Sequence, residues 1–115
     1  MPAVGGALSR AVFALAVLAS LVVLFAPGSD VPSAPPGVDK LVHLLVFAGL
    51  AVTGRWAGIP RTPLAVGLVL YAVGSELVQG LTPLARSASV ADGAADLAGV
   101  AVGLLVWRWG ARRSR

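Results

Sequence analysis

Four long apolar segments, separated by short polar or proline- and glycine-rich stretches, make up most of this chain. A helix needs about 20 apolar residues to cross a bilayer, and the segments 7–26, 39–57, 63–80 and 89–109 approach that length. Charged residues are 12% of the 115 residues, whereas a soluble domain uses about 25%. The pattern predicts an all-α, polytopic membrane protein, a four-transmembrane-helix bundle forming a single domain over residues 1–115.

The first apolar segment admits two interpretations. Arg10 followed by the apolar run 11–26 has the order of a signal peptide, a basic region before a hydrophobic one. The run is long for that purpose, and no clear A-x-A cleavage site follows it, which favours an uncleaved span. Loss of this span would unsettle the orientation of the others.

Basic residues are distributed unevenly around the four segments. With the N-terminus inside, only Lys40 and Arg86 fall on the outer side. Because Lys and Arg concentrate in cytoplasmic loops, both termini are predicted to be cytoplasmic. The inner residues are Arg10, Arg55, Arg61, Arg108, Arg112, Arg113 and Arg115. They flank apolar runs and form no patch with interleaved aromatics, so no nucleic-acid partner is expected.

The residue usage indicates the kind of organism that encodes the protein and where in the cell the protein lies. Ala, Val, Gly and Arg are heavily used and isoleucine occurs once, which indicates a GC-rich bacterial genome. Together with the four segments, this predicts a multi-pass protein of a bacterial plasma membrane.

The connections carry recognisable helix-boundary signals. Residues 58–61 are expected to form a tight turn, and Thr62 to cap the third helix with Pro63 at its first position. Gly110 is expected to end the fourth helix. Asp39 stands where a helix N-cap belongs.

Ionisable side chains recur near the outer ends of three segments. His43 lies four residues into the second segment, Glu76 four residues before the end of the third, and Asp96 four residues after Asp92 in the fourth. With a rise of about 1.5 Å per residue, each lies about 6 Å below its helix end. Such groups are costly inside a membrane and usually face the bundle interior, so we expect them to converge.

Helical spacing reinforces this expectation. Residues three or four positions apart share a helix face, and three polar pairs have this spacing: Asp39 with His43, Glu76 with Gln79, and Asp92 with Asp96. The fourth-segment stripe continues through Gly99 and Gly103, whose spacing is typical of close helix packing. The polar stripe is therefore predicted to point into the bundle.

The composition excludes several chemistries. The chain has no cysteine and a single histidine, which excludes thiolate metal sites, His-rich zinc sites and phosphatases with paired histidines. A hard divalent cation held by the oxygens of Glu76, Asp92 and Asp96 stays open. No other cofactor is indicated.

The polar motifs, in their order and spacing, resemble the VanZ-like family of small bacterial membrane proteins. Asp39-Lys40-x-x-His43 opens a span, and Glu76-x-x-Gln79 closes the next one. Arg86-x-x-Ser89-x-x-Asp92-x-x-x-Asp96-x-x-Gly99 leads into the last. The resemblance covers residues 36–103, with one departure: Asp96 stands where the family often has Asn.

This resemblance implies a four-span bundle and an association with resistance to lipoglycopeptide antibiotics, in particular teicoplanin. It also implies action on lipid head groups, so the expected partners are membrane lipids and a lipid-linked or glycopeptide-type ligand.

The preferred hypothesis is phosphoryl or head-group transfer at the outer membrane face. His43 is the expected general acid/base, because histidine titrates near neutral pH, with Asp39 or Glu76 orienting it or sharing its role. Lys40 and Arg86 would hold the phosphate by charge-assisted hydrogen bonds. The remaining polar side chains would contact the head group: Gln79, Asp92 and Asp96.

Two alternatives stay open beside catalysis. The chain could bind a lipid or an antibiotic without transforming it, or serve as an accessory subunit of a transporter. The His43 cluster could equally be a structural clasp between helices. Whether the protein is an enzyme is therefore left undecided, as is its oligomeric state.

Overall fold

The computed structural model describes residues 3–25, 37–81 and 90–113. They form four α-helices, which confirms the all-α prediction, and each helix begins and ends within a few residues of a predicted segment. The helices are α1 (Ala7–Phe25), α2 (Val38–Trp56), α3 (Arg61–Leu81) and α4 (Val90–Arg113). By length and composition, α1, α3 and α4 are each suited to cross a membrane.

The helix α2 differs from the other three in composition. Its 19 residues make it about 28 Å long, close to the roughly 30 Å of a hydrocarbon core. It carries Asp39 and Lys40 in its first turn and Arg55 in its last. These charges lie at the two ends of the helix and leave an apolar middle. The length of α2 therefore fits a span, although α2 is not among the three helices that length and composition together suit to cross a membrane.

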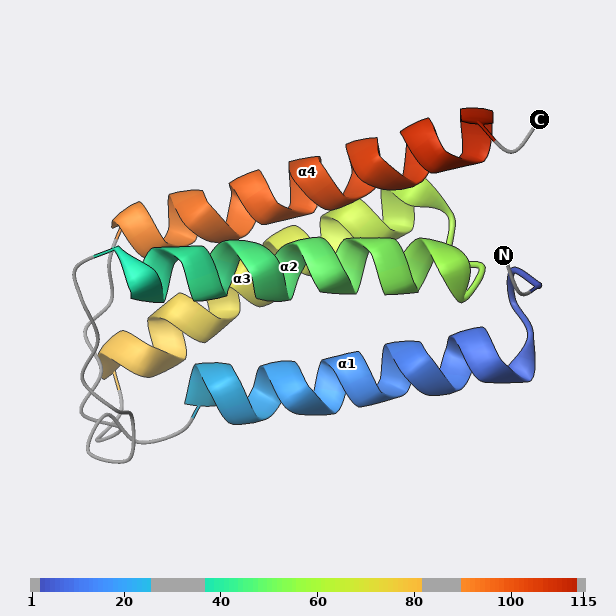
Figure 1. Ribbon diagram of the computed structural model, residues 1–115. Coiled ribbons are helices and arrows are strands. Elements are labelled where there is room, and N and C mark those ends of the chain that lie inside the picture. The colour runs from blue at the N-terminus through green and yellow to red at the C-terminus, as the bar shows by residue number, and fades with distance from the viewer. Residues whose placement is uncertain (1–2, 26–36, 82–89, 114–115) are drawn as a thin grey trace.

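Successive helices run in opposite directions, and the described ends of the chain lie at the same end of the bundle (Figure 1). Helix α2 packs most extensively against α4 and also contacts α1 and α3. The ends that carry His43, Glu76 and Asp96 therefore meet at the opposite end of the bundle, away from the termini.

Two glycines explain how closely α2 and α4 approach. A Cβ at Gly99 would collide with the carbonyl oxygen of Leu44, and one at Gly103 would lie 2.5 Å from the carbonyl oxygen of Ala48. Only a residue without a side chain fits at either position, as in other close helix contacts. The predicted packing stripe is thus confirmed, and its partner is α2.

The turn between α2 and α3 occupies residues 57–60, close to the predicted position. Gly58 adopts φ 96°, a conformation that favours glycine. The N–H groups of Gly58 and Ile59 donate to the carbonyl oxygens of Arg55 and Gly54, at 3.0 and 3.1 Å. These bonds satisfy carbonyl groups that the end of α2 would otherwise leave unpaired.

Three boundary predictions are wrong. Thr62 does not cap α3, because the helix begins at Arg61 and Pro63 lies within its first turn, where a missing N–H is tolerated. The N-cap of α2 is Gly37, with φ 89°, so Asp39 lies inside the first turn. Helix α4 continues through Gly110 to Arg113.

The interior is small, and much of the outer surface is apolar. Phe47 is fully buried, and its ring centroid lies 5.6 Å from that of Tyr71. By contrast, Leu15 on α1 and Leu70 on α3 are 64% and 67% exposed. An apolar exterior around a small polar-containing interior is what a lipid environment favours, and it agrees with the three span-length helices.

Candidate functional site

A buried histidine–aspartate pair joins α2 to α4. His43 Nδ1 lies 2.7 Å from Asp96 Oδ1, and the side chains of the two residues are 4% and 0% exposed. A carboxylate can only accept, so the ring donates from Nδ1. The bond fixes the ring orientation and leaves Nε2 as the nitrogen available to a ligand.

Two more carboxyl groups approach the same histidine. His43, Glu76 and Asp92 each offer a ligand atom, and these atoms all lie within 4.8 Å of one another. They come from α2, α3 and α4 respectively. Asp92 is buried and Glu76 is half-buried. The expected convergence of side chains from three helices is therefore observed.

Lys40 lies at the rim of this cluster. Its Nζ is 2.9 Å from Asp39 Oδ2 and 3.1 Å from Asp92 Oδ1. Asp39 is exposed and Lys40 is half-buried, whereas the Asp92 side chain is only 12% exposed. The lysine therefore balances charge at the mouth of the cluster, and its ammonium is already shared between two carboxylates.

The partner of His43 differs from the expected one. Asp39 or Glu76 was expected to orient the ring, but Asp39 is exposed and pairs with Lys40. Asp96, expected to contact a head group, holds His43 instead. Its position one turn before Gly99 was the available signal, because that stripe faces α2.

Two predicted site residues cannot be placed in the same way. Gln79 belongs to α3, but its side chain is not among those described. Arg86 lies outside the described residues. Their expected contacts with a phosphate stay predictions.

One atom of the cluster has unmet bonding capacity. Asp96 Oδ2 is buried and has no hydrogen-bond partner among the described residues. Buried carboxylate oxygens normally accept a hydrogen bond. A donor from a bound ligand or a water molecule would satisfy this oxygen.

Taken together, the cluster can orient an imidazole, exchange a proton and bind a cation. Its described residues include four carboxyl groups, from Asp39, Glu76, Asp92 and Asp96, against one lysine and one histidine. Mixed carboxylate and imidazole ligands suit several divalent metals. A bare anion would be repelled by so many carboxylates, so a positively charged group would have to accompany it.

Comparison with protein-family models, with curated proteins and with solved structures finds no match to this chain. The resemblance to the VanZ-like family thus rests on the polar motifs alone.

Proposed function

We propose that this chain is a four-span bacterial plasma-membrane protein, with both termini cytoplasmic, that acts on phosphate-bearing lipid head groups at the outer face. Three span-length helices and the length of α2 support the four spans. The arginine-rich ends of the helices support the orientation.

The observation that carries the proposal is the buried His43–Asp96 pair with Glu76 and Asp92 beside it. A histidine oriented by a buried carboxylate is a common arrangement for general acid–base catalysis. These are four ionisable groups from three helices, and ionisable side chains inside membrane helices are costly and usually mark a functional site.

In the proposed reaction, His43 Nε2 removes the proton of an attacking water or alcohol. The oxygen attacks the phosphorus of the head group, and the bond from phosphorus to the leaving oxygen breaks. The imidazolium returns its proton to that leaving oxygen. Asp96 keeps the ring in place through the Nδ1 bond and stabilises its charged form.

A divalent cation fits this proposal. Glu76 and Asp92 would hold it with carboxylate oxygens beside His43. It would supply positive charge that draws the phosphate toward a carboxyl-rich site. Because the same ring nitrogen cannot both ligate the cation and accept a proton, a metal titration of His43 variants separates these two roles.

A second function is favoured by the depth of the pair. Asp96 is completely buried and His43 is nearly so, which also suits a clasp that holds α2 against α4 in a non-catalytic lipid- or antibiotic-binding protein. The two functions differ in what a conservative change does. If the pair is a clasp, a conservative substitution should abolish function only by lowering the stability of the protein. If the pair is catalytic, the same substitution should abolish function while the protein stays folded.

The test compares His43→Gln and Glu76→Gln with the wild type in a deletion strain. We expect both variants to insert and fold with near-normal melting temperatures, yet to fail to restore lipid composition or teicoplanin tolerance. Thr53→Ala is the control, because the Thr53 hydroxyl bonds the Gly49 carbonyl within α2, away from the cluster. Folded variants that complement fully would reject the head-group site, and variants that never fold would favour the clasp.

A further inference from the structure

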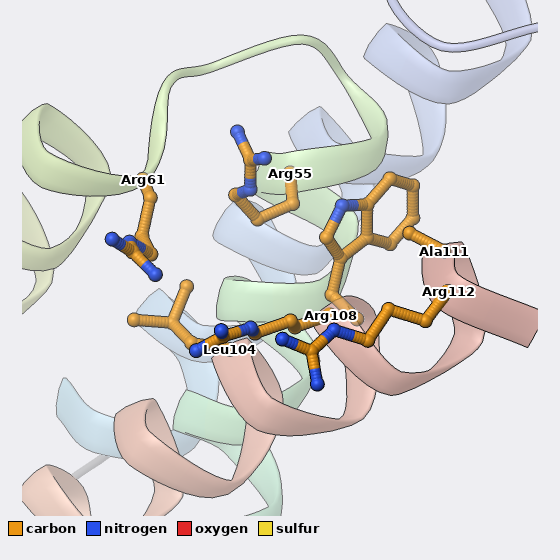
Figure 2. A pocket seen from close by; sticks show the side chains of 7 residues that line it. Arg55, Arg61, Leu104, Arg108, Ala111 and Arg112 are labelled. Carbon is orange, nitrogen blue, oxygen red and sulfur yellow. The ribbon is translucent and has the colours of Figure 1, made fainter.

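A second site lies at the opposite end of the bundle, where α2 and α4 end and α3 begins. It is a pocket of about 360 Å³. Figure 2 shows side chains of its lining approaching from these three helices. The residues that matter for its chemistry are Arg55, Arg61, Leu104, Trp107, Arg108 and Arg112.

Four guanidinium groups surround this one space, and no carboxyl group is among the lining residues. The described acidic residues, Asp39, Glu76, Asp92 and Asp96, belong to the cluster at the other end. Like charges gathered around a cavity repel one another unless an anion lies between them. Arg55 is held in place, since its Nη1 donates to the Ile59 carbonyl at 2.9 Å.

The helix dipole does not account for all four arginines of the pocket. Arg55, Arg108 and Arg112 lie near helix C-termini, where a positive charge is favourable. Arg61 is the first residue of α3, where the helix already presents positive partial charge and a cation is unfavourable. An anion in the pocket would offset that cost.

The lining also indicates what kind of anion fits. A guanidinium donates two parallel hydrogen bonds to a phosphate, a geometry that an ammonium cannot reproduce. Leu104 and Trp107 add an apolar wall, and tryptophan is enriched where lipid meets water. The volume falls in the range of about 300–1,000 Å³ that small-molecule sites occupy.

We propose that this arginine pocket binds a phosphate group, carried by an anionic phospholipid or present as free phosphate. The site is separate from the His43 cluster and does not depend on its function. Under the orientation proposed above, it faces the cytoplasm, where the membrane surface is rich in anionic lipid.

The experiment measures binding to the purified full-length protein in detergent by native mass spectrometry and by thermal shift. The probes are phosphatidylglycerol, zwitterionic phosphatidylcholine and inorganic phosphate. Phosphatidylcholine carries the same phosphodiester group, but the four arginines would repel its choline cation. We therefore expect phosphatidylglycerol to bind about tenfold more tightly than phosphatidylcholine. Stabilisation by inorganic phosphate alone would identify free phosphate as the source. Binding of neither anion would overturn the proposal.

Matched variants test the pocket itself. The double variant Arg61→Gln/Arg108→Gln should weaken binding by about tenfold or more. Arg10→Gln removes an exposed charge on α1 that does not line the pocket, and it should leave binding unchanged. The double variant Arg61→Lys/Arg108→Lys keeps the charge and serves if the glutamine variant does not fold. It should also bind more weakly, because an ammonium cannot donate the two parallel hydrogen bonds of a guanidinium. Equal losses in the Arg10 and pocket variants, or wild-type binding by the lysine variant, would show a diffuse charge effect and reject the site.

Discussion

His43 Nδ1 and Asp96 Oδ1 lie 2.7 Å apart, which connects the first turns of α2 to the first turns of α4 with a buried hydrogen bond. The residues are 53 positions apart in the chain. The bond is possible because Gly99 and Gly103, further along the same α4 stripe, let the two backbones approach closely. The packing of the helices and the polar site are therefore one arrangement.

The acceptor at position 96 can be tested by replacing its carboxylate with an amide. Asp96→Asn keeps an oxygen that accepts the bond from His43, so we expect a near-normal melting temperature. Asp96→Leu leaves a buried imidazole donor without a partner, which should lower the free energy of unfolding by about 1–3 kcal/mol. Thermal denaturation of the two purified variants measures the difference. Equal stability of the two would mean that His43 has another acceptor.

Divalent cations should stabilise the protein through His43, Glu76 and Asp92. After treatment with a chelator, addition of Mg²⁺, Ca²⁺ or Mn²⁺ should raise the melting temperature. A cation at 100 times its dissociation constant adds about 2.7 kcal/mol of stability. The shift should disappear in Glu76→Gln, because its carboxylate is one of the two that would hold the cation.

The control for this titration is Ser75→Ala, at the buried residue next to Glu76 in the sequence. The Ser75 hydroxyl donates to the Ala72 carbonyl on its own helix and is not one of the candidate ligands. It should keep the cation response. Loss of the response in His43→Gln would make the ring a ligand, and retention would leave it free for proton transfer. An identical shift in all variants and the wild type would exclude a cation site at the cluster.

The close contact of α4 with α2 predicts a sharp difference between two glycines of one helix. Gly99→Ala places a methyl group against the Leu44 carbonyl and should destabilise by about 1–3 kcal/mol. Gly110→Ala meets no atom within 4 Å and should be neutral or stabilising. Melting temperatures in detergent compare them. A tolerated Gly99→Ala would mean that the helices are further apart.

The proposed orientation can be tested because the chain has no cysteine of its own. Single cysteines at Ser33 and Ser87 should react with an impermeant thiol reagent in intact cells, because both are expected outside. A cysteine at Ser114 should react only after the cells are broken. Labelling of Ser114 alone in intact cells would reverse the orientation and move the His43 cluster to the cytoplasmic face.

Much of the fold follows from local pattern. Long apolar segments can satisfy their backbone groups in a membrane only as helices or closed barrels, and their boundaries predicted α1 to α4 to within a few residues. The errors concern helix ends. Pro63 lies within the first turn of α3, where a helix tolerates several residue types, and α4 continues past Gly110. The shared depth of His43, Glu76 and Asp96 could likewise be derived from helix rise alone.

The sequence by itself determined the helices, the depth of their polar residues and the inward direction of the α4 stripe. Only the tertiary structure decided which carboxylate bonds His43. Glu76 and Asp96 share its depth and differ only in how their helices are rotated and spaced, whereas Asp39 lies one turn nearer the end of the same helix. Only the tertiary structure brought Arg61 to the arginines of α2 and α4. In the sequence these arginines report orientation; their common pocket depends on how α3 crosses the bundle, which no local pattern specifies.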